Sequence, residues 1–423
     1  VKTDKISSFE PIIHKDGVFS FGLKYGHAML QLGDGTYLHT LPAVTSMDMD
    51  NMNMMSGSMT QMYTSSTSTT NTKTEITSIY GVGTTNYIFG NASTTDYTSP
   101  TKILELYVDK IRLYSYSSSH VGFITHDNKL FMFGTNNYGQ FGNAQSSTTG
   151  VGVTQITVDL PFELKDVTSL YLGNHTTSVL TNKGEVYGCG HNANGVFGTS
   201  NFSNQTLFTQ IPVSEFVVKS FINADVSIHL TNTNKVYWCG LGRPLGNTTK
   251  YNTIQLLNIN NEEFIDISAG SASVALITKN KELYMCGAKY YGELGNGGGN
   301  DHSGIQYKHT TYFQTGTDDE IVEILHAHRN SVILTKSKQL WSMSSHSSTS
   351  FQNTNVENGS LYPNKFYRGE QPSVNGSAYL ENVMKIVSIG FSDVVVQTTD
   401  FKTYRIGNNG GLSNTASPIV VDI

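Results

Sequence analysis

The sequence is poor in the residues that define several large protein classes. It contains 3 cysteines, 9 prolines and 2 tryptophans in 423 residues, and only 14% of its residues are charged, against about 25% in an average soluble domain. Three cysteines cannot form a disulfide framework, and this composition argues against a disordered chain or a coiled coil. No run approaches the roughly 18–20 consecutive apolar residues that a membrane-spanning helix needs. We therefore expect a folded domain that is not inserted into a membrane.

Positive charge is also scarce. The formal net charge is −6 and the sequence pI is about 6.1, so no general positive field would collect phosphates, and nucleic acid is not expected as a partner. The sequence contains no Walker loop, dinucleotide-binding glycine fingerprint, nucleophile elbow or HExxH zinc motif. We therefore predict a protein that is not an enzyme, with no catalytic residue, no cofactor and no metal site.

Glycine, by contrast, is abundant, and many of the glycines recur at regular spacings. The pattern G-x4-G-x2-G occurs three times after an apolar run, and its glycines are Gly134, Gly139, Gly142, Gly190, Gly195, Gly198, Gly287, Gly292 and Gly295. Weaker copies follow Gly22, Gly83, Gly240 and Gly407, and Ser344 stands once in the anchor position. The eight anchors recur every 55 residues on average. Self-similarity at a fixed period predicts a repeat fold.

A second spacing lies in register with the first. Seventeen residues before six of the anchors stand Gly173, Gly270, Gly390, Ser117, Asn223 and Ala327. Between the two positions, as in 178–190, 273–287 and 331–343, the residues predict two short strands joined by a tight turn. One such unit is a small antiparallel sheet that cannot bury both faces alone, so the units must stack and close into a ring. The sequence therefore predicts an all-β chain that forms a single β-propeller over residues 1–423.

The repeated glycines then have a structural explanation. Strand ends that converge near a propeller axis crowd the backbone, and glycine allows both close approach and a positive φ. We expect this role for the glycines of the three full copies and for Gly173, Gly270, Gly390 and Gly407.

One segment, LFMFGTNNYGQFG (130–142), carries the repeat most clearly. The pattern of an apolar strand, then G-x-N-x-x-G-x-[Leu/Phe]-G, preceded by G-x-x-[Ser/His]-x-x-x-Leu-Thr, resembles the repeat of the regulator of chromosome condensation family, and the resemblance spans essentially the whole chain. It implies a propeller with seven blades, whereas the eight anchors leave an eighth blade open. Enlarged loops are expected at 64–74, 296–319 and 345–382.

Each cysteine stands one residue before an anchor glycine. Cys189, Cys239 and Cys286 occupy the position that holds Phe133 or Ile406 in other repeats. We therefore interpret them as small apolar packing residues, and a thiol or metal role is the alternative.

Residues 47–62 hold seven of the twelve methionines, and clusters of thioethers can bind Cu(I). If Gly57 is aligned with Gly270, however, Met52 and Met54 fall on the strand positions of Ile265 and Ile267. Core packing is therefore the preferred interpretation, and copper binding stays the alternative.

Histidines offer a weaker sign of metal binding. His326 and His328 lie two apart on a predicted strand, so both side chains could face one ligand, but no third ligand with a fitting spacing is visible. His120 and His175 fall in turns, where bonding to the backbone is expected.

Partner contacts are expected in the long loops, because loops carry most binding residues of a rigid scaffold. Tyrosine, phenylalanine and arginine are the usual interface anchors, and the predicted partner-binding residues are Tyr307, Tyr312, Phe313, Phe351, Tyr362, Phe366, Tyr367 and Arg368.

A propeller does not fix a function. The first hypothesis is a non-enzymatic protein-binding or structural propeller that serves as a subunit of a larger assembly. The resemblance implies the alternative, a guanine-nucleotide exchange factor that presses one face and an inserted wedge against a small GTPase, although no residues here match such a wedge. The Ser, Thr, Asn and Tyr content favours an extracellular or lumenal compartment, whereas exchange activity would require the cytoplasm or the nucleus.

Overall fold

The structure is a computed structural model. It describes residues 111–117, 119–246, 249–270, 273–287, 294–297, 305–310, 312–327 and 330–343, together with strand segments 27–29, 37–39, 64–66, 76–83, 97–107, 364–365, 382–389, 393–399, 403–407 and 419–421. No helix in this part of the chain is long and apolar enough to cross a membrane.

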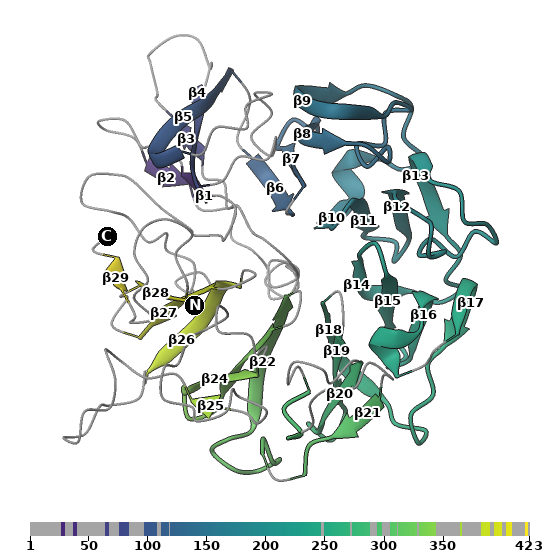
Figure 1. Ribbon diagram of the computed structural model, residues 1–423, viewed down its shortest axis with the longest axis vertical. Coiled ribbons are helices and arrows are strands. Elements are labelled where there is room, and N and C mark those ends of the chain that lie inside the picture. The colour runs from purple at the N-terminus through teal and green to yellow at the C-terminus, as the bar shows by residue number, and fades with distance from the viewer. Residues whose placement is uncertain are drawn as a thin grey trace, which may run out of the picture.

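Four-stranded antiparallel sheets follow one another around a central axis (Figure 1). Each sheet takes its strands in sequence order, from the innermost to the outermost. The first three are β6 (Ile111–Tyr116), β7 (His120–Thr125), β8 (Leu130–Asn136) and β9 (Ser147–Ile156); β10 (Val167–Gly173), β11 (Thr176–Thr181), β12 (Val186–Gly190) and β13 (Gln205–Ile211); and β14 (Val217–Ile222), β15 (Val226–Thr231), β16 (Val236–Leu241) and β17 (Lys250–Leu256).

Three further four-stranded sheets continue the ring. They are β18 (Phe264–Ala269), β19 (Ser273–Thr278), β20 (Leu283–Gly287) and β21 (Ile305–Lys308); β22 (Ile321–Ala327), β23 (Asn330–Thr335), β24 (Leu340–Met343) and β25 (Asn364–Lys365); and β26 (Val383–Ile389), β27 (Asp393–Thr398), β28 (Thr403–Gly407) and β29 (Ile419–Val421). Short 3-10 turns, η2 (Leu164–Asp166) and η3 (Arg243–Leu245), lie between strands.

The N-terminal part contributes a seventh sheet with three described strands, β1 (His27–Met29), β4 (Ile76–Gly83) and β5 (Tyr97–Tyr107), and a separate pair, β2 (Tyr37–His39) with β3 (Thr64–Ser66). The anchor Gly83 ends the strand that pairs with β1. The predicted all-β propeller of stacked antiparallel sheets is confirmed, and its described part shows seven sheets of three or four strands around the axis.

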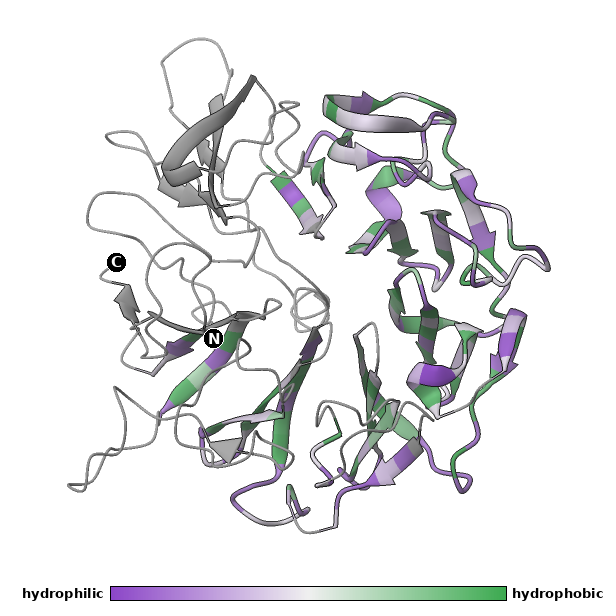
Figure 2. Ribbon diagram, viewed as in Figure 1, coloured by the Kyte–Doolittle hydropathy of each residue, from purple (hydrophilic) through white to green (hydrophobic). Residues whose placement is uncertain are grey.

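The predicted hairpins are present in the middle of each sheet. Strands β11, β15 and β19 are buried at every position, because neighbouring sheets cover both of their faces. Hydrophilic residues gather on outer strands such as β17 and β21 (Figure 2). Burial on both faces therefore includes polar residues of these strands, such as Thr177, Ser227 and His229.

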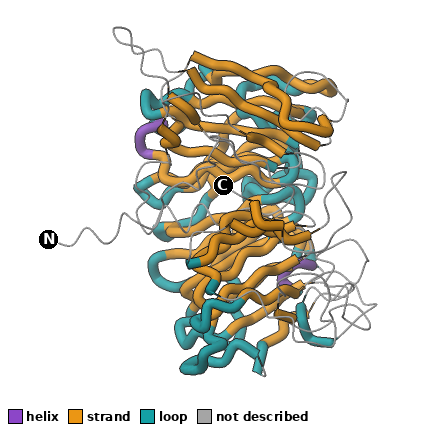
Figure 3. The backbone as a smooth tube through the Cα atoms, turned by 90° about the vertical axis from the view of Figure 1, so that its left-hand side faces the viewer, coloured by secondary structure: helices purple, strands orange, loops and turns teal. Residues whose placement is uncertain are grey.

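The turn between the second and third strands has one repeated conformation. Its tip residue has a positive φ in five sheets, at Asn128, Gly184, Asn234, Lys281 and Lys338. In each of these turns the tip N–H donates to the carbonyl of the threonine that ends the second strand, at 2.8–3.0 Å. We call the end of the propeller that carries these turns the turn face. The opposite end carries the corners between first and second strands and the loops between third and fourth strands, and we call it the loop face (Figure 3 shows loops at both ends of the stacked strands).

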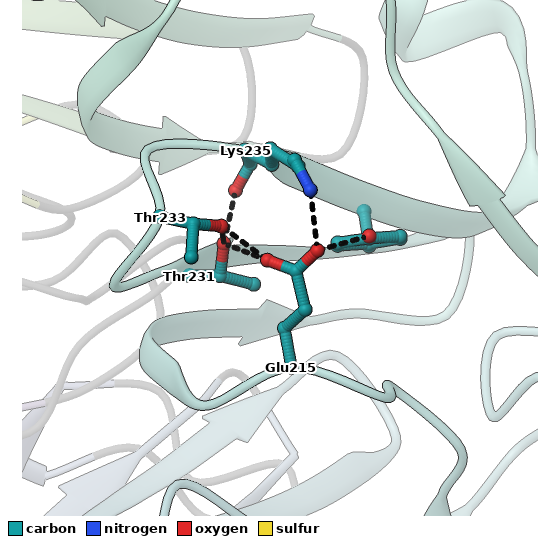
Figure 4. Close-up of polar contacts among 5 residues, drawn as sticks. Glu215, Thr231, Thr233 and Lys235 are labelled. Atoms are coloured by element: carbon teal, nitrogen blue, oxygen red, sulfur yellow. Dashed lines mark hydrogen bonds and ion pairs between the residues drawn. The ribbon is translucent and has the colours of Figure 1, made fainter.

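On the turn face, Glu215, which stands two residues before β14, contacts the hairpin of β15 and β16 (Figure 4). Its carboxylate accepts hydrogen bonds from Tyr237 at 2.8 Å, from Thr231 at 3.1 Å and from Thr233, and it pairs with Lys235 at 2.7 Å. The hydrogen bond from Lys235 is the largest of the interactions that lower the pKa of Glu215 to about 2. These contacts join the polar turn between β15 and β16 to the segment that precedes β14.

Backbone hydrogen bonds join neighbouring sheets at both ends. On the turn face, the Val217 N–H donates to the carbonyl of Gly184 at 3.1 Å. On the loop face, the Ala144 N–H donates to Thr206 on the outer strand of the next sheet at 2.8 Å. The bond from Ser200 to Asn252, also 2.8 Å, repeats this loop-face contact one sheet further on.

The glycines of the repeat have positive φ at Gly134, Gly139, Gly142, Gly190, Gly195, Gly198, Gly287 and Gly295. Their surroundings correct the expected reason. A Cβ on Gly139 would lie 2.7 Å from Thr206 Cα, so the close approach is to the outer strand of the next sheet and not to the axis. Gly173 on a first strand fits the axial explanation, because its Cβ would meet the Ile222 carbonyl of the neighbouring innermost strand. Gly292 and Gly390 lie outside the described residues.

Candidate functional site

On the loop face, the same backbone hydrogen bond recurs in three consecutive sheets. In each sheet, the residue after the anchor glycine donates its backbone N–H to the corner between the first two strands: Thr135 to Ser119 at 2.8 Å, His191 to His175 at 2.9 Å and Leu241 to Asp225 at 2.6 Å. The corner and the loop of one sheet are therefore held together, so side chains at these positions have fixed relative places.

A buried asparagine organises two of these loops. Asn136 Oδ1 accepts the Phe141 N–H at 3.0 Å, and its Nδ2 donates to the Gln145 carbonyl at 3.1 Å. Asn192 makes the equivalent bond to the Phe197 N–H at 3.3 Å. Both asparagines stand two residues after an anchor glycine, so they are the Asn of the G-x-N motif. The motif thus specifies the shape of the loop.

The fourth residue after the anchor glycine reaches across to the next sheet. The Tyr138 ring lies 4.6 Å from the His191 ring, edge-on, and 5.1 Å from the His175 ring. Asn194, in the same position one sheet later, donates its Nδ2 to Asp225 Oδ1 and to the Ala224 carbonyl, both at 3.0 Å. A continuous row of side chains, which we call the loop-face strip, is formed by Tyr138, His175, His191, Asn194 and Asp225.

Burial controls the charges of the loop-face strip. It lowers the pKa of His175 and of His191, and it raises the pKa of Asp225. The charge of Asp225 partly opposes the shift at His191, and His191 and Arg243 partly oppose the shift at Asp225. The strip therefore presents half-buried aromatic, amide and carboxylate groups that suit stacking and hydrogen bonding to another molecule.

Three of the residues predicted to bind a partner are described. Tyr307 lies half-buried on β21, 4.8 Å from the His309 ring. Tyr312 is half-buried and packs on the core beside Phe313. Phe313 is only 2% exposed and lies 5.4 Å from the Trp341 ring, so its prediction as a surface anchor is wrong. The apolar core between two sheets takes up this aromatic ring, which a loop position alone could not reveal.

The other predicted contacts, Phe351, Tyr362, Phe366, Tyr367 and Arg368, lie outside the described residues and stay predictions. The segments expected as enlarged loops also contain strands. Strand β3 falls within 64–74, β21 within 296–319 and β25 within 345–382. The last two are the outer strands of their sheets.

The histidines and cysteines have structural surroundings. His120 is buried and bonds hydroxyl groups, with Nδ1 2.8 Å from Ser119 Oγ and Nε2 2.8 Å from Thr177 Oγ1, rather than the backbone as expected. His326 Nε2 lies 2.7 Å from Ser273 Oγ. Within the described ranges, no group of three or more His, Cys, Asp or Glu side chains could hold a metal ion. His328 and the methionine-rich segment 47–62 lie outside these ranges.

The cysteines pack as predicted. Cys189, Cys239 and Cys286 are all free and fully buried. Burial raises the pKa of the Cys239 and Cys286 thiols to about 12 and that of Cys189 well above its usual value.

Sequence reasoning missed most of the loop-face strip. Tyr138, His191 and Asn194 differ in type, so no residue pattern marks them. The signal that could have found them is their offset from the anchor glycine, one residue for His191 and four for the other two. Asp225 stands in the corner position, where no other described repeat has an acid.

Comparison with known proteins agrees with this fold. No protein-family model matches the chain. Part of it is 28% identical over 182 residues to the human E3 ubiquitin-protein ligase HERC2, 28% identical over 183 residues to the X-linked retinitis pigmentosa GTPase regulator of the dog, and 26% identical over 212 residues to an RCC1 repeat-containing protein of Dictyostelium discoideum. These matches cover 40%, 43% and 47% of this chain but only 4%, 13% and 41% of the relatives.

Solved structures match over a larger share of the chain. Prp20p of Saccharomyces cerevisiae has a TM-score of 0.63 at 16% identity, over 89% of this chain and 88% of that one. Human WBSCR16 has a TM-score of 0.60 at 16% identity, over 79% and 87% of the two chains. The molecule is thus a β-propeller of the RCC1 type. Its repeat motif and these partial matches show that the chain is similar to RCC1 repeat proteins.

Proposed function

We propose that the protein is a non-enzymatic, protein-binding propeller that docks a partner on its loop face, as a subunit of a larger assembly. The observation that supports this most is the loop-face strip, in which Tyr138 and Asn194 cross to the next sheet at equivalent positions. The side chains are held by neighbours before any partner arrives, so little rotamer entropy is lost on binding. Tyrosine and histidine rings with polar tips are typical of interface anchors.

Photo-crosslinking tests this proposal directly. A photoreactive amino acid replaces Asn137, which is exposed beside Tyr138 on the loop face. The matched control replaces Lys183, exposed in a turn on the opposite face. We expect one protein from the native source to be crosslinked in defined stoichiometry from position 137 and not from position 183. Equal labelling from both positions, or from neither, would contradict a partner on the loop face.

Guanine-nucleotide exchange is the second candidate function, favoured by one observation. The fold match spans nearly the full length of Prp20p, a protein studied for its binding to Gsp1p and histones, and yeast RCC1 (Prp20) has also been solved bound to Kap60. If this chain shared such chemistry, adding it to a small GTPase loaded with a fluorescent guanine nucleotide would accelerate nucleotide release. A rate equal to that of the GTPase alone, across representatives of the main small-GTPase families, would rule exchange out.

A further inference from the structure

Four lysines of the turn face form ion pairs. Lys129 pairs with Asp127 at 2.6 Å and Lys279 with Glu263 at 2.7 Å. The turns with Lys183 and Lys235 contain similar pairs, at 3.4 Å to Asp166 and 2.7 Å to Glu215. Two basic residues lie on the loop face. Arg243 and Lys250 are exposed, and no carboxylate of the described side chains lies within ion-pair distance of either one.

The backbone brings Arg243 and Lys250 to one corner of the loop face. Leu241 pairs with Lys250 in the register of β16 and β17, and the Gly242 N–H donates to the Thr249 carbonyl at 2.9 Å. Arg243 follows directly. The Leu241 N–H also donates to the carbonyl of Asp225, a member of the loop-face strip. The backbones of Arg243 and Lys250 are therefore joined to the end of the strip through main-chain hydrogen bonds.

An exposed aromatic ring completes this corner. Lys250 Nζ lies 4.8 Å from the centroid of the Phe202 ring. Phe202 comes from the loop of the preceding sheet and is 47% exposed, one of five large hydrophobic side chains noted as exposed in the described part of the chain. The contact places an apolar surface next to the Lys250 charge, across the boundary between two sheets.

The electrostatic balance of the corner is positive although the whole chain carries −6. Asp225 is the one described carboxylate joined to the corner, and Asn194 already binds one of its oxygens. The field of Lys250 extends to the strip, because it adds to the effect of burial in lowering the pKa of His191. The described charged groups of the corner are thus two cations and one carboxylate, and their sum is positive.

We propose that Phe202, Arg243 and Lys250 form a docking patch for an acidic segment of the protein partner. Carboxylates of that segment pair with Arg243, whose guanidinium can hold a carboxylate in bidentate fashion, and with Lys250. An apolar side chain between the acids covers the Phe202 ring. This inference rests on the proposed function, since it names the chemistry of the partner on the same face. Charge complementarity supports it, because the two exposed cations would attract an acidic segment.

The test uses a fluorescein-labelled peptide of alternating Glu and Leu, and a matched peptide with Gln in place of Glu. Fluorescence anisotropy measures binding to the full chain between low and physiological salt. We expect the Glu peptide to bind, the Gln peptide to bind at least tenfold more weakly, and the affinity of the Glu peptide to fall as salt rises. The double variant Arg243→Glu/Lys250→Glu should lose at least tenfold in affinity for the Glu peptide, and Phe202→Ala should lose a smaller factor.

The matched control is Lys165→Glu/Lys336→Glu, which changes the net charge equally at two exposed lysines away from the loop face. It should bind the Glu peptide like the unaltered chain. Equal loss in both double variants, equal binding of the two peptides, or no binding at millimolar peptide would overturn the inference. A partner crosslinked from position 137 whose affinity is insensitive to Arg243→Glu/Lys250→Glu would overturn the acidic patch while leaving the proposed function intact. Stronger competition by an oligonucleotide than by the Glu peptide would assign the patch to nucleic acid and overturn it as well.

Discussion

Asn194 donates its side-chain amide to the carboxylate of Asp225 at 3.0 Å, across the boundary between two sheets of the propeller. The two residues are 31 positions apart, and each belongs to a different repeat. The bond joins the loop of one unit to the corner of the next on the face that we propose for partner binding. It therefore contributes both to the packing of these two neighbouring sheets and to the shape of the loop face.

Removing this bond should weaken the fold measurably. In Asn194→Ala, the half-buried Asp225 carboxylate and the Ala224 carbonyl lose a donor, and we expect a loss of about 1–2 kcal/mol in the free energy of unfolding. Urea denaturation followed by circular dichroism measures it. Asn137→Ala is the control, because Asn137 is exposed in the neighbouring repeat loop; an equal loss there would refute a specific role for the bond.

Gly139→Val should destabilise the propeller strongly. Gly139 has φ 80°, and its Cβ would lie 2.7 Å from a backbone atom of Thr206, so both strain and a clash act, and we expect a loss of more than about 2 kcal/mol. Gly316→Val separates the two effects: Gly316 has φ 78° but nothing within 4 Å of its Cβ. It should lose about 1 kcal/mol. If both variants lose the same amount, the close approach between sheets is not what the glycine protects.

Acid should destabilise the protein through its buried histidines. Burial lowers the pKa of His120 and of His229 to about 3, and that of His309 to about 4, so the unfolded chain binds more protons than the folded one. The stabilisation is complete above the unfolded pKa near 6.5 and is lost as the pH falls toward the folded value. One pH unit below 6.5, each such histidine costs about 1.4 kcal/mol. Denaturation at pH 7.5, 6.5 and 5.5 should show this decline.

Replacing a buried histidine tests the assignment of this acid sensitivity. His229→Asn removes one of the three groups, so its free energy of unfolding should change less between pH 7.5 and 5.5, although it starts lower. His126→Asn is the control, because His126 is exposed in a turn, and it should keep the full slope. A His229→Asn slope as steep as that of the unaltered chain would contradict the prediction.

The three thiols should be unreactive in the folded protein. They are fully buried, and burial raises the pKa of each, so thiolate is scarce and reagent cannot enter. Ellman's reagent at pH 8 should label no cysteine in buffer and three in denaturant. Rapid labelling of any one in the native state would show that the packing interpretation fails at that residue.

The spacing of glycines was enough to predict the fold because it repeats. A glycine at each third-strand end and a partner position seventeen residues earlier define one sheet, and a sheet with two apolar faces must be covered by others. The asparagine of the G-x-N motif also recurs with one structural role, since Asn136 and Asn192 each accept the backbone N–H of a phenylalanine five residues later. Local chemistry that recurs can be recognised without knowing what lies beside it.

The functional face could not be derived in the same way. Phe313 is an aromatic residue in a predicted loop, as a surface anchor would be, but it lies in the core. Tyr138 had no feature that set it apart from other loop residues, but it lies against two histidines of the next sheet. Offsets along the chain say which position a residue takes within its own unit. They do not say what the neighbouring unit places against it.

The sequence by itself determined the repeat, the strand order within each sheet and the need for a closed ring, because hydrogen bonding and burial act similarly in every unit. The tertiary structure alone decided which side chains meet between units. It placed Gly139 against Thr206, Asn194 on Asp225, and Lys250 over Phe202. These contacts join residues dozens of positions apart, and they depend on the distance and angle between sheets, which only the packing of the whole ring fixes.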